Sequence, residues 1–379
     1  MVYYVRQGRM PRTRHTYESR NKLLREELFG EESFDGSYSL LYHRNEPTRI
    51  KSIREARKDE PKFETLKLHK MIDTDIQKRQ GNFINGRKPL FGNETLHILI
   101  LKPSSRTSDL FRHGIRDQLF FVHRGDGKFK TIMGELPFGE GDYIYVPKGT
   151  IYNLEHSEDA EFLLIESRDN ISVPQRYLNR YGQIKEGVPY YSRDFRHPVL
   201  RRGREVKKNC EVYVDFDDRY VVETRDSSPF DLEGWDGYHF PFAINIRDIM
   251  PIVGKVHQPP PVHETFSSKS FMVGTFLPRK YDFHERAIPI SYYHSNVDTD
   301  EFLYYASGNF MSRKGIREGS ITIHVRGMIH GPQPGTVEKS LGKEETDETG
   351  IMVESYERLG ISEEGKRLEN KNYMKTWYE

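Results

Sequence analysis

The sequence predicts a fold dominated by β-strands and organised as two similar jelly-roll-like barrels, with short helices and an N-terminal extension. Short runs of β-branched and aromatic residues alternate with Gly, Asp and Pro at intervals of roughly 8–12 residues, a spacing typical of sandwiches and barrels. The same order of strands, Gly turns and hairpins occurs in both halves of the chain. Aromatic residues, which favour strands, make up 12% of the 379 residues.

The first half divides into an N-terminal layer and a first barrel. Residues 1–90 alternate charged clusters with short apolar patches, so we expect a β-rich layer that packs on the barrels. Residues 91–170 are expected to form the first barrel. Its predicted strands include Leu96–Leu101, Gln118–Val122, Lys128–Ile132 and Asp142–Val146.

The second half repeats this plan after a polar stretch. Residues 171–232 are Arg-rich and show little periodicity, which predicts a connecting segment. Residues 233–379 are expected to form the second barrel, followed by a polar tail. Its predicted strands include Phe271–Phe276, Phe302–Ala306, Ser320–Ile323 and Ile351–Tyr356.

Composition and charge exclude several classes of function. The formal net charge is +1, so no overall field would attract nucleic acid or an anionic membrane surface. No apolar run approaches the roughly 20 residues of a membrane span, and the N-terminus lacks an apolar leader region. The one cysteine, Cys210, provides no disulfide framework, which favours a reducing compartment. We therefore expect a cytoplasmic protein.

Two separated motifs in the second half contain residue types that bind metals. In a barrel, such motifs can direct two imidazoles and one carboxylate from separate strands into one cavity. This set leaves three open octahedral positions, as in non-haem Fe(II) oxygenases, whereas zinc favours closed tetrahedral sets. The motifs are His294-Ser295-Asn296, four residues, Glu301, six residues, Gly308, and Gly319, five residues, Val325-Arg326-Gly327, two residues, His330. They resemble the two motifs of the cupin superfamily, and this resemblance implies His294, Glu301 and His330 as the Fe(II) ligands.

The first half carries the same two patterns without the ligands. Gln118 stands where the acid would be, and Tyr152 stands where the histidine of the second motif would be. His113 is the one histidine near a ligand position. We therefore predict that the first barrel lacks metal ligands and has a structural role.

The two motifs resemble those of the cupin superfamily, in which Asn296 would be a second histidine. The resemblance implies a bicupin fold. Within the cupins, the chain resembles the homogentisate 1,2-dioxygenase family, as a divergent member with one extra residue between His294 and Glu301. The similar segments are Trp235–Pro241, Thr275–Lys280, Tyr292–Asn296, Glu301–Phe302, His324, His330–Pro332 and Tyr373–Trp377.

The family resemblance implies an activity and its requirements. It implies Fe(II)- and O₂-dependent cleavage of homogentisate (2,5-dihydroxyphenylacetate) to maleylacetoacetate, a step in tyrosine and phenylalanine breakdown. It also implies a homo-oligomer built from trimers. A phenol of pKa ~10 must lose its proton, so a neutral imidazole beside the metal is expected as general base. Similarity to the family's base-bearing segment favours His257, and His263 remains the alternative.

Further side chains are expected at the substrate. His324 lies six residues before His330 and is expected to face the same cavity and orient the substrate. Tyr292 shares strand parity with His294, so we expect it to point inward and donate a hydrogen bond to the substrate. His263 and His330 complete the predicted substrate contacts.

Three other functions remain open on the sequence alone. The first is a cupin dioxygenase for a related dihydroxy-aromatic acid such as gentisate. The second is a metal-free bicupin that serves as a binding or structural module. The third is a cupin isomerase with zinc or manganese, although such sites usually keep the histidine that Asn296 replaces.

Overall fold

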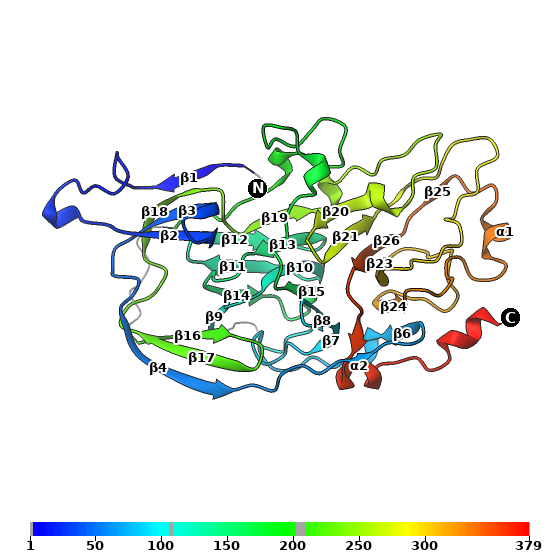
Figure 1. The fold of residues 1–379 in the computed structure, drawn as a ribbon, viewed down its shortest axis with the longest axis horizontal. Coiled ribbons are helices and arrows are strands. Elements are labelled where there is room, and N and C mark those ends of the chain that lie inside the picture. Colours follow the sequence, from blue (N-terminus) through cyan, green and yellow to red (C-terminus); the bar gives the residue numbers. More distant parts are fainter. Residues whose placement is uncertain (1–2, 106–108, 202–208, 379) are drawn as a thin grey trace.

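The computed structural model describes residues 3–105, 109–201 and 209–378, which form two β-rich lobes lying side by side (Figure 1). Cyan and green segments dominate one lobe, and yellow, orange and red segments dominate the other. Strands make up most of the regular structure, which confirms the predicted all-β fold with short helices. The helices of the described residues are α1 (Thr336–Ser340), α2 (Glu363–Arg367) and the 3₁₀ segments η1 (Arg20–Lys22), η2 (Thr74–Ile76), η3 (Gln175–Tyr177), η4 (Ser192–Asp194), η5 (Ile246–Asp248), η6 (Pro260–His263) and η7 (Tyr373–Trp377).

Two large sheets form the first barrel. The eight-stranded sheet has the order β19 (Phe242–Asn245), β13 (Asp142–Val146), β10 (Asp117–Arg124), β15 (Glu161–Ser167), β8 (Leu96–Leu101), β7 (Pro89–Gly92), β27 (Gly360–Ile361), β5 (Glu64–Thr65). The seven-stranded sheet has the order β12 (Gly134–Phe138), β11 (Gly127–Thr131), β14 (Tyr152–His156), β9 (Leu110–His113), β16 (Cys210–Asp215), β17 (Arg219–Arg225), β4 (Ile50–Arg57). Between them lies an apolar core rich in phenylalanine.

The eight-stranded sheet is apolar on both of its faces. In β10, Phe120 and Val122 point into the core of the first barrel, whereas Leu119 and Phe121 point to the opposite face. Side chains alternate along a strand, so a strand buried on both sides is a continuous apolar run, as in β8. The sheet is therefore shared between two cores.

The second barrel is less regular. One wall is a six-stranded antiparallel sheet with the order β20 (Glu264–Ser267), β21 (Phe271–Phe276), β26 (Thr349–Ser355), β23 (Asp300–Ser307), β24 (Ser320–His324), β6 (Lys70–Asp73). Loops and the two-stranded ribbon of β22 (Arg279–Lys280) and β25 (Glu345–Thr346) supply the rest. The polar residues of the candidate site lie between this sheet and these loops.

A second apolar core joins the two barrels. Phe302, Ile323 and Val353 of the six-stranded sheet belong to the same cluster as Leu119 and Phe121 of the first barrel, and each is at most 3% exposed. Because side chains alternate along β23, the neighbours of Phe302 face the other way, into the second barrel. Packing between the barrels thus determines which face of the sheet carries the site.

A four-stranded sheet connects the N-terminal strands to the first barrel. Its order is β1 (Val5–Gly8), β18 (Leu232–Gly237), β3 (Asp35–His43), β2 (Arg25–Glu32). Trp235 of β18 is fully buried, and its Nε1 donates to the carbonyl of Met133 at 2.8 Å. This contact holds the small sheet against the first barrel.

The strand pairing differs from the predicted domain boundaries. Residues 1–90 do not form a separate layer, because their strands belong to every large sheet. Residues 171–232 are not only a connection, since β16 and β17 extend the seven-stranded sheet. The strand β19, expected in the second barrel, pairs with β13 of the first. These pairings join positions far apart in the chain, which local periodicity does not reveal.

The strands predicted from local patterns are present. Each of the eight predicted runs corresponds to a strand whose ends differ from the prediction by no more than two residues. The corresponding strands are β8, β10, β11, β13, β21, β23, β24 and β26. Apolar runs between Gly and Pro punctuation were therefore sufficient to locate the core strands.

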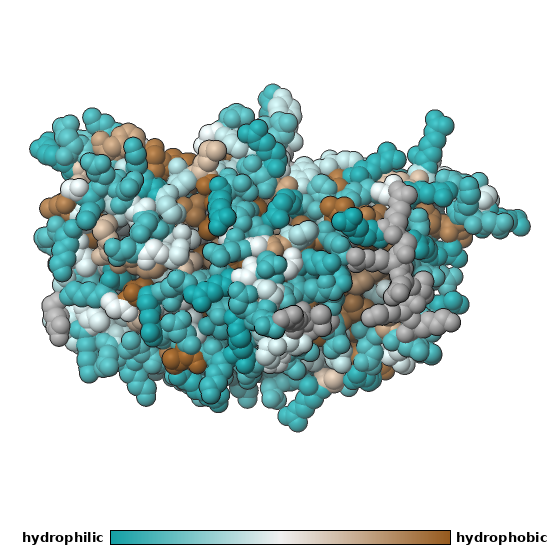
Figure 2. Space-filling model, turned by 180° about the vertical axis from the view of Figure 1, so that it is seen from behind, coloured by the Kyte–Doolittle hydropathy of each residue, from teal (hydrophilic) through white to brown (hydrophobic). Residues whose placement is uncertain are grey.

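The surface is strongly polar. Figure 2 shows a mostly hydrophilic face on which hydrophobic residues form small separate areas. Charged residues make up 30% of the sequence, in keeping with this surface. In the described ranges, no helix is long and apolar enough to cross a membrane.

Candidate metal centre

Three side chains from separate parts of the chain converge in the second barrel. Glu301 lies on β23, and His294 and His330 lie on two loops that exchange backbone hydrogen bonds of 2.9 Å. The Oε2 atom of Glu301 is 3.5 Å from Nε2 of His294 and 3.9 Å from Nε2 of His330. The structure therefore brings together the three residues predicted as metal ligands.

Backbone contacts leave the facing imidazole nitrogens available. His294 Nδ1 donates to the carbonyl of Tyr292 at 3.2 Å, and His330 Nδ1 donates to the carbonyl of Met328 at 3.0 Å. Because a carbonyl oxygen only accepts, each Nδ1 carries the proton and each Nε2 keeps a lone pair. Among the described residues, His330 Nε2 is buried without a hydrogen-bond partner. A bound cation would satisfy this nitrogen.

Glu301 is held ionised and oriented. Burial raises its pKa, but interactions with the neighbouring histidines His294, His324 and His330 outweigh this effect and hold the pKa well below its usual value. His324 Nδ1 donates to Glu301 Oε1 at 2.6 Å. The other carboxylate oxygen, Oε2, is therefore the one that faces His294 and His330.

A second carboxyl group lies beside Glu301. Glu354 of β26 is directly opposite Glu301, and both of its Oε atoms are 3.2 Å from the donor Asn296 Nδ2. Asn296, which stands at the motif position of a second histidine, thus holds Glu354. Burial and repulsion from Glu301 raise the pKa of Glu354 to about 7. Two adjacent carboxyl groups in a buried site favour a nearby cation.

The donor set fits a divalent ion. Two imidazoles and one carboxylate meet on one side of a cavity, which leaves coordination positions open for other molecules. Each ligand is also fixed by a further hydrogen bond, to a backbone carbonyl or to His324. On this chemistry, His294, Glu301 and His330 are suited to hold iron(II).

The candidate metal centre adjoins a cavity of about 150 Å³. His294 and Glu301 line it, together with apolar side chains such as Ile290, Leu303 and Phe310. The lining therefore combines metal ligands with surfaces against which an aromatic ring can pack.

A histidine–aspartate pair forms part of the cavity wall. His257 Nδ1 donates to Asp282 Oδ2 at 2.5 Å, which leaves the lone pair on Nε2. Within the described residues, this Nε2 has no hydrogen-bond partner. The ring of Tyr292 lies 5.1 Å from the His257 ring. An imidazole in this state can accept a proton from a molecule in the cavity.

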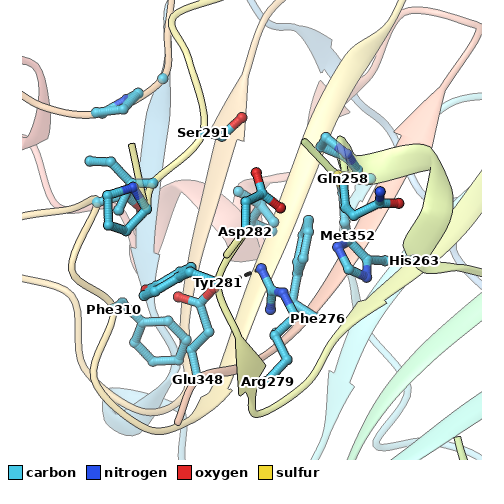
Figure 3. A pocket seen from close by; sticks show the side chains of 18 of the residues that line it. Gln258, His263, Phe276, Arg279, Tyr281, Asp282, Ser291, Phe310, Glu348 and Met352 are labelled. Atoms are coloured by element: carbon cyan, nitrogen blue, oxygen red, sulfur yellow. Dashed lines mark ion pairs between the residues drawn. The ribbon is translucent and has the colours of Figure 1, made fainter. Parts of the chain in front are cut away.

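Two guanidinium groups add positive charge to the cavity. Figure 3 shows Arg279 reaching between Glu348 and His263, and its Nη2 is 3.6 Å from Glu348 Oε1. Arg313 instead donates through Nη1 to the carbonyl of Gly331, and its Nε is buried without a partner in the described part of the chain. Arg279 is therefore balanced by a carboxylate, whereas Arg313 is available for an anion.

The other predicted site residues differ in their position relative to the cavity: one lines it, one is exposed at the surface and one is buried behind Glu301. His263 lines the cavity, and burial, followed by Arg279 and His257, lowers its pKa to about 3. The prediction that Tyr292 points inward is wrong, because its segment is not a strand and the residue is 56% exposed. His324 shares the sheet face of Glu301, but it is fully buried behind that residue and does not line the cavity.

Sequence reasoning missed several residues of the site. Asp282 and Arg313 line the cavity outside either motif, so no spacing rule selects them. Glu354 becomes recognisable only when the pairing of β26 with β23 is known. Tyr373 belongs to the tail segment that resembles the family, yet the resemblance assigns it no role.

The first barrel contains a second group of potential ligands, His113, Asp215 and Asp217. Sequence reasoning placed only His113 near a ligand position, and the aspartates come from β16 and the turn that follows it. Basic side chains already form ion pairs with both aspartates: they are Lys58, Arg87, Arg116 and Arg168. A divalent ion at this place would meet those positive charges.

The motif positions of the first barrel form a hydrogen-bonded network. Tyr152 donates to Gln118 Oε1 at 2.7 Å, and Gln118 Nε2 donates to Glu166 Oε1 at 2.8 Å. Arg87 Nη1 lies 2.5 Å from the same Glu166 oxygen, and its guanidinium lies 4.4 Å from the ring of Phe111. Burial raises the pKa of Glu166, but the charge of Arg87 outweighs it and the pKa falls to about 2. In the first barrel, the buried guanidinium of Arg87 thus supplies the positive charge that balances Glu166.

Comparison with known proteins identifies the family. The model of the homogentisate 1,2-dioxygenase N-terminal family matches residues 56–246, about half of the chain. A candidate dioxygenase of Saccharolobus solfataricus is 43% identical over 385 residues, which cover 100% of both chains. The chain belongs to the homogentisate 1,2-dioxygenase family. The family model ends before the metal centre, but the relative from S. solfataricus covers that region as well.

More distant relatives are named homogentisate 1,2-dioxygenase. The human enzyme is 23% identical over 325 residues, covering 79% of this chain and 72% of the enzyme. The enzyme of Rhodopseudomonas palustris is also 23% identical, and the match spans only 59% of its length. Among solved structures, a cupin barrel protein from Leptotrichia buccalis covers 80% of this chain at 9% identity and a TM-score of 0.31, too low to carry an argument. Membership of the homogentisate 1,2-dioxygenase family supports a dioxygenase.

Metal analysis tests the centre in the second barrel. After anaerobic loading and removal of free metal, the chain is expected to retain a single Fe(II), because three ligands converge there. Glu301→Ala and His330→Ala each remove one ligand and should retain little iron. The matched variant His113→Asn alters the cluster of the first barrel and should keep the full content. Loss of iron in His113→Asn but not in His330→Ala would place the ion in the first barrel instead.

Arg87→Met tests whether the guanidinium balances the buried acids of the first barrel. Its removal leaves Glu166 and Asp215 short of positive charge, which typically costs about 3–5 kcal/mol. The free energy of unfolding in urea measures this cost. Arg54→Met, which breaks an exposed ion pair between β4 and β16, is the control and should change stability far less than Arg87→Met. Equal effects of the two changes would contradict the assigned role of Arg87.

Proposed function

We propose that the chain is an iron(II)-dependent dioxygenase that opens the aromatic ring of homogentisate to give maleylacetoacetate. The observation that carries the proposal is the meeting of His294, Glu301 and His330 beside a cavity that also holds His257 and Arg313. Family membership supports the reaction class. The names of the more distant relatives suggest homogentisate as the first substrate to test.

The three ligands would hold the metal on one side of the cavity. Bound iron(II) would supply Lewis acidity and the electron-transfer capacity that a reaction of an aromatic ring with O₂ requires. The remaining wall is apolar, with Phe310 and Leu303 available to pack against the ring and to limit the access of water.

His257 is the residue best placed to act as the base. The residue lines the cavity, and its Nε2 carries a lone pair and has no hydrogen-bond partner among the described residues. A phenol of pKa ~10 gives up its proton more readily when such an acceptor is within reach. Asp282 holds His257 in the required tautomer and stabilises the imidazolium that proton transfer creates.

Arg313 is suited to bind the carboxylate of the substrate. Its Nη1 donates to a backbone carbonyl rather than to a carboxylate, and its Nε is buried without a partner in the described residues. A charge-assisted hydrogen bond to a carboxylate would satisfy this guanidinium. Arg279 is less suited, because Glu348 lies beside it.

Oxygen consumption tests the reaction and its substrate. The iron-loaded chain is expected to consume O₂ with homogentisate, with an ultraviolet change as the ring is lost. In gentisate the carboxylate is attached directly to the ring. Comparison with homogentisate therefore tests whether turnover depends on the distance between the ring and the carboxylate that Arg313 is proposed to bind. Phenylacetate, which lacks both hydroxyl groups, should give no uptake.

The same assay separates the alternatives. Faster turnover of gentisate than of homogentisate would reject the proposed substrate and keep the reaction class. Full iron content without uptake on any dihydroxy acid would reject the dioxygenase. Activity that persists without O₂ would indicate an isomerase.

His257→Gln tests the assigned base. The change removes the proton acceptor, so kcat is expected to fall on the order of 10²-fold while iron content stays unchanged. Asp282→Asn should lower kcat in the same direction, because the aspartate orients His257. His284→Gln alters an exposed histidine of the neighbouring loop and should leave kcat unchanged. Unaltered turnover in His257→Gln would exclude this residue as the base.

A further inference from the structure

The C-terminal tail lies against the back of the metal centre. In η7, Tyr373 is 2% exposed, and the ring of Trp377 lies 6.2 Å from the ring of His324. Thr376 accepts a hydrogen bond of 2.6 Å from Gln333, which follows the ligand His330 by three residues. The end of the chain is thus attached to the segment that carries a ligand.

One hydrogen-bonded chain runs from this tail to the centre. The hydroxyl of Tyr373 is 3.0 Å from His324 Nε2, and His324 Nδ1 is 2.6 Å from Glu301 Oε1. A carboxylate only accepts, so the proton of the neutral His324 ring is on Nδ1. Nε2 must then accept, and Tyr373 donates to it. The ring of His324 is fully buried between these two partners.

The tautomer of His324 determines what Glu301 can offer. With Nδ1–H bound to Oε1, the carboxylate presents Oε2 toward His294 and His330. If the proton moved to Nε2, a lone pair on Nδ1 would face the carboxylate, and Glu301 would lose both its donor and its fixed orientation. Tyr373 favours the Nδ1–H tautomer, because the proton that its hydroxyl donates occupies the lone pair on Nε2.

We propose that Tyr373 is a positioning residue of the metal centre, which acts through the tautomer of His324 to orient Glu301. The inference rests on the proposed metal centre. It extends the site to the C-terminal tail, whose residues Tyr373–Trp377 are not among those that line the cavity. Substitution of residues that orient metal ligands in this way typically lowers metal affinity 10–100-fold.

A double-mutant cycle tests the proposal on the full-length chain, with the dissociation constant of Fe(II) measured by anaerobic equilibrium dialysis. Tyr373→Phe removes only the donated proton and should weaken Fe(II) binding about tenfold or more. His324→Asn keeps an N–H near the position of Nδ1 but lacks Nε2. In this background, Tyr373→Phe should have no further effect, because the two residues act as one unit.

Controls separate positioning from folding. Tyr143→Phe removes another hydroxyl group from a fully buried tyrosine. This hydroxyl forms a hydrogen bond of 2.9 Å with Thr275 rather than with a candidate ligand, so the change should leave Fe(II) affinity unchanged. Melting temperatures of the metal-free variants report any general loss of stability.

The outcomes distinguish this inference from the function on which it rests. Wild-type affinity in Tyr373→Phe, or an equal loss in the His324→Asn background, overturns the role of Tyr373 while the metal centre stands. Absence of Fe(II) binding by the wild-type chain overturns the metal centre itself, and the inference with it.

Discussion

The pairing of two carboxyl groups across adjacent strands is the constraint on which the candidate site depends. Glu301 and Glu354 stand opposite each other on β23 and β26, on the face turned away from the apolar core. Like charges in such positions repel each other, and burial increases the cost. A neighbouring side chain reduces that cost for each carboxyl group: His324 donates a hydrogen bond to Glu301, and Asn296 donates one to Glu354. The remaining demand for positive charge lies where the two ligand histidines meet Glu301.

The first barrel meets a similar demand in another way. Gln118 stands opposite Glu166 on β10 and β15, in the same relation as Glu301 to Glu354. In the first barrel an amide, Gln118, takes the place of one of the two acids. The buried guanidinium of Arg87 lies beside the remaining acid, Glu166. The guanidinium of Arg87 is covalently part of the chain, so it supplies positive charge without a coordination position to which another molecule could bind. One strand arrangement therefore supports a closed polar core in one barrel and an open donor set in the other.

Local sequence patterns predicted the strands and the convergence of His294, Glu301 and His330, but not the surroundings of these residues. Apolar runs located β10 and β23, because alternation and turn residues are local properties. The spacing of the two motifs was informative because β23 and the two loops that carry His294 and His330 face one interior, although only Glu301 lies on a strand as expected. The position of Tyr292 was predicted wrongly, since parity holds only within a strand and its segment is a loop. Asp282 and Arg313 were missed because tertiary packing alone brings them to the cavity.

The core shared by the two barrels also limits how the molecule can move. Phe302 and Val353 on the back of the site sheet pack into the same cluster as Leu119 of the first barrel. A large apolar contact of this kind opposes hinge motion between domains. The opposite wall of the cavity consists of loops, on which His257 and Asp282 are located. The sheet that is fixed by the shared core therefore carries Glu301, and segments outside any sheet carry the imidazole that we propose as the proton acceptor.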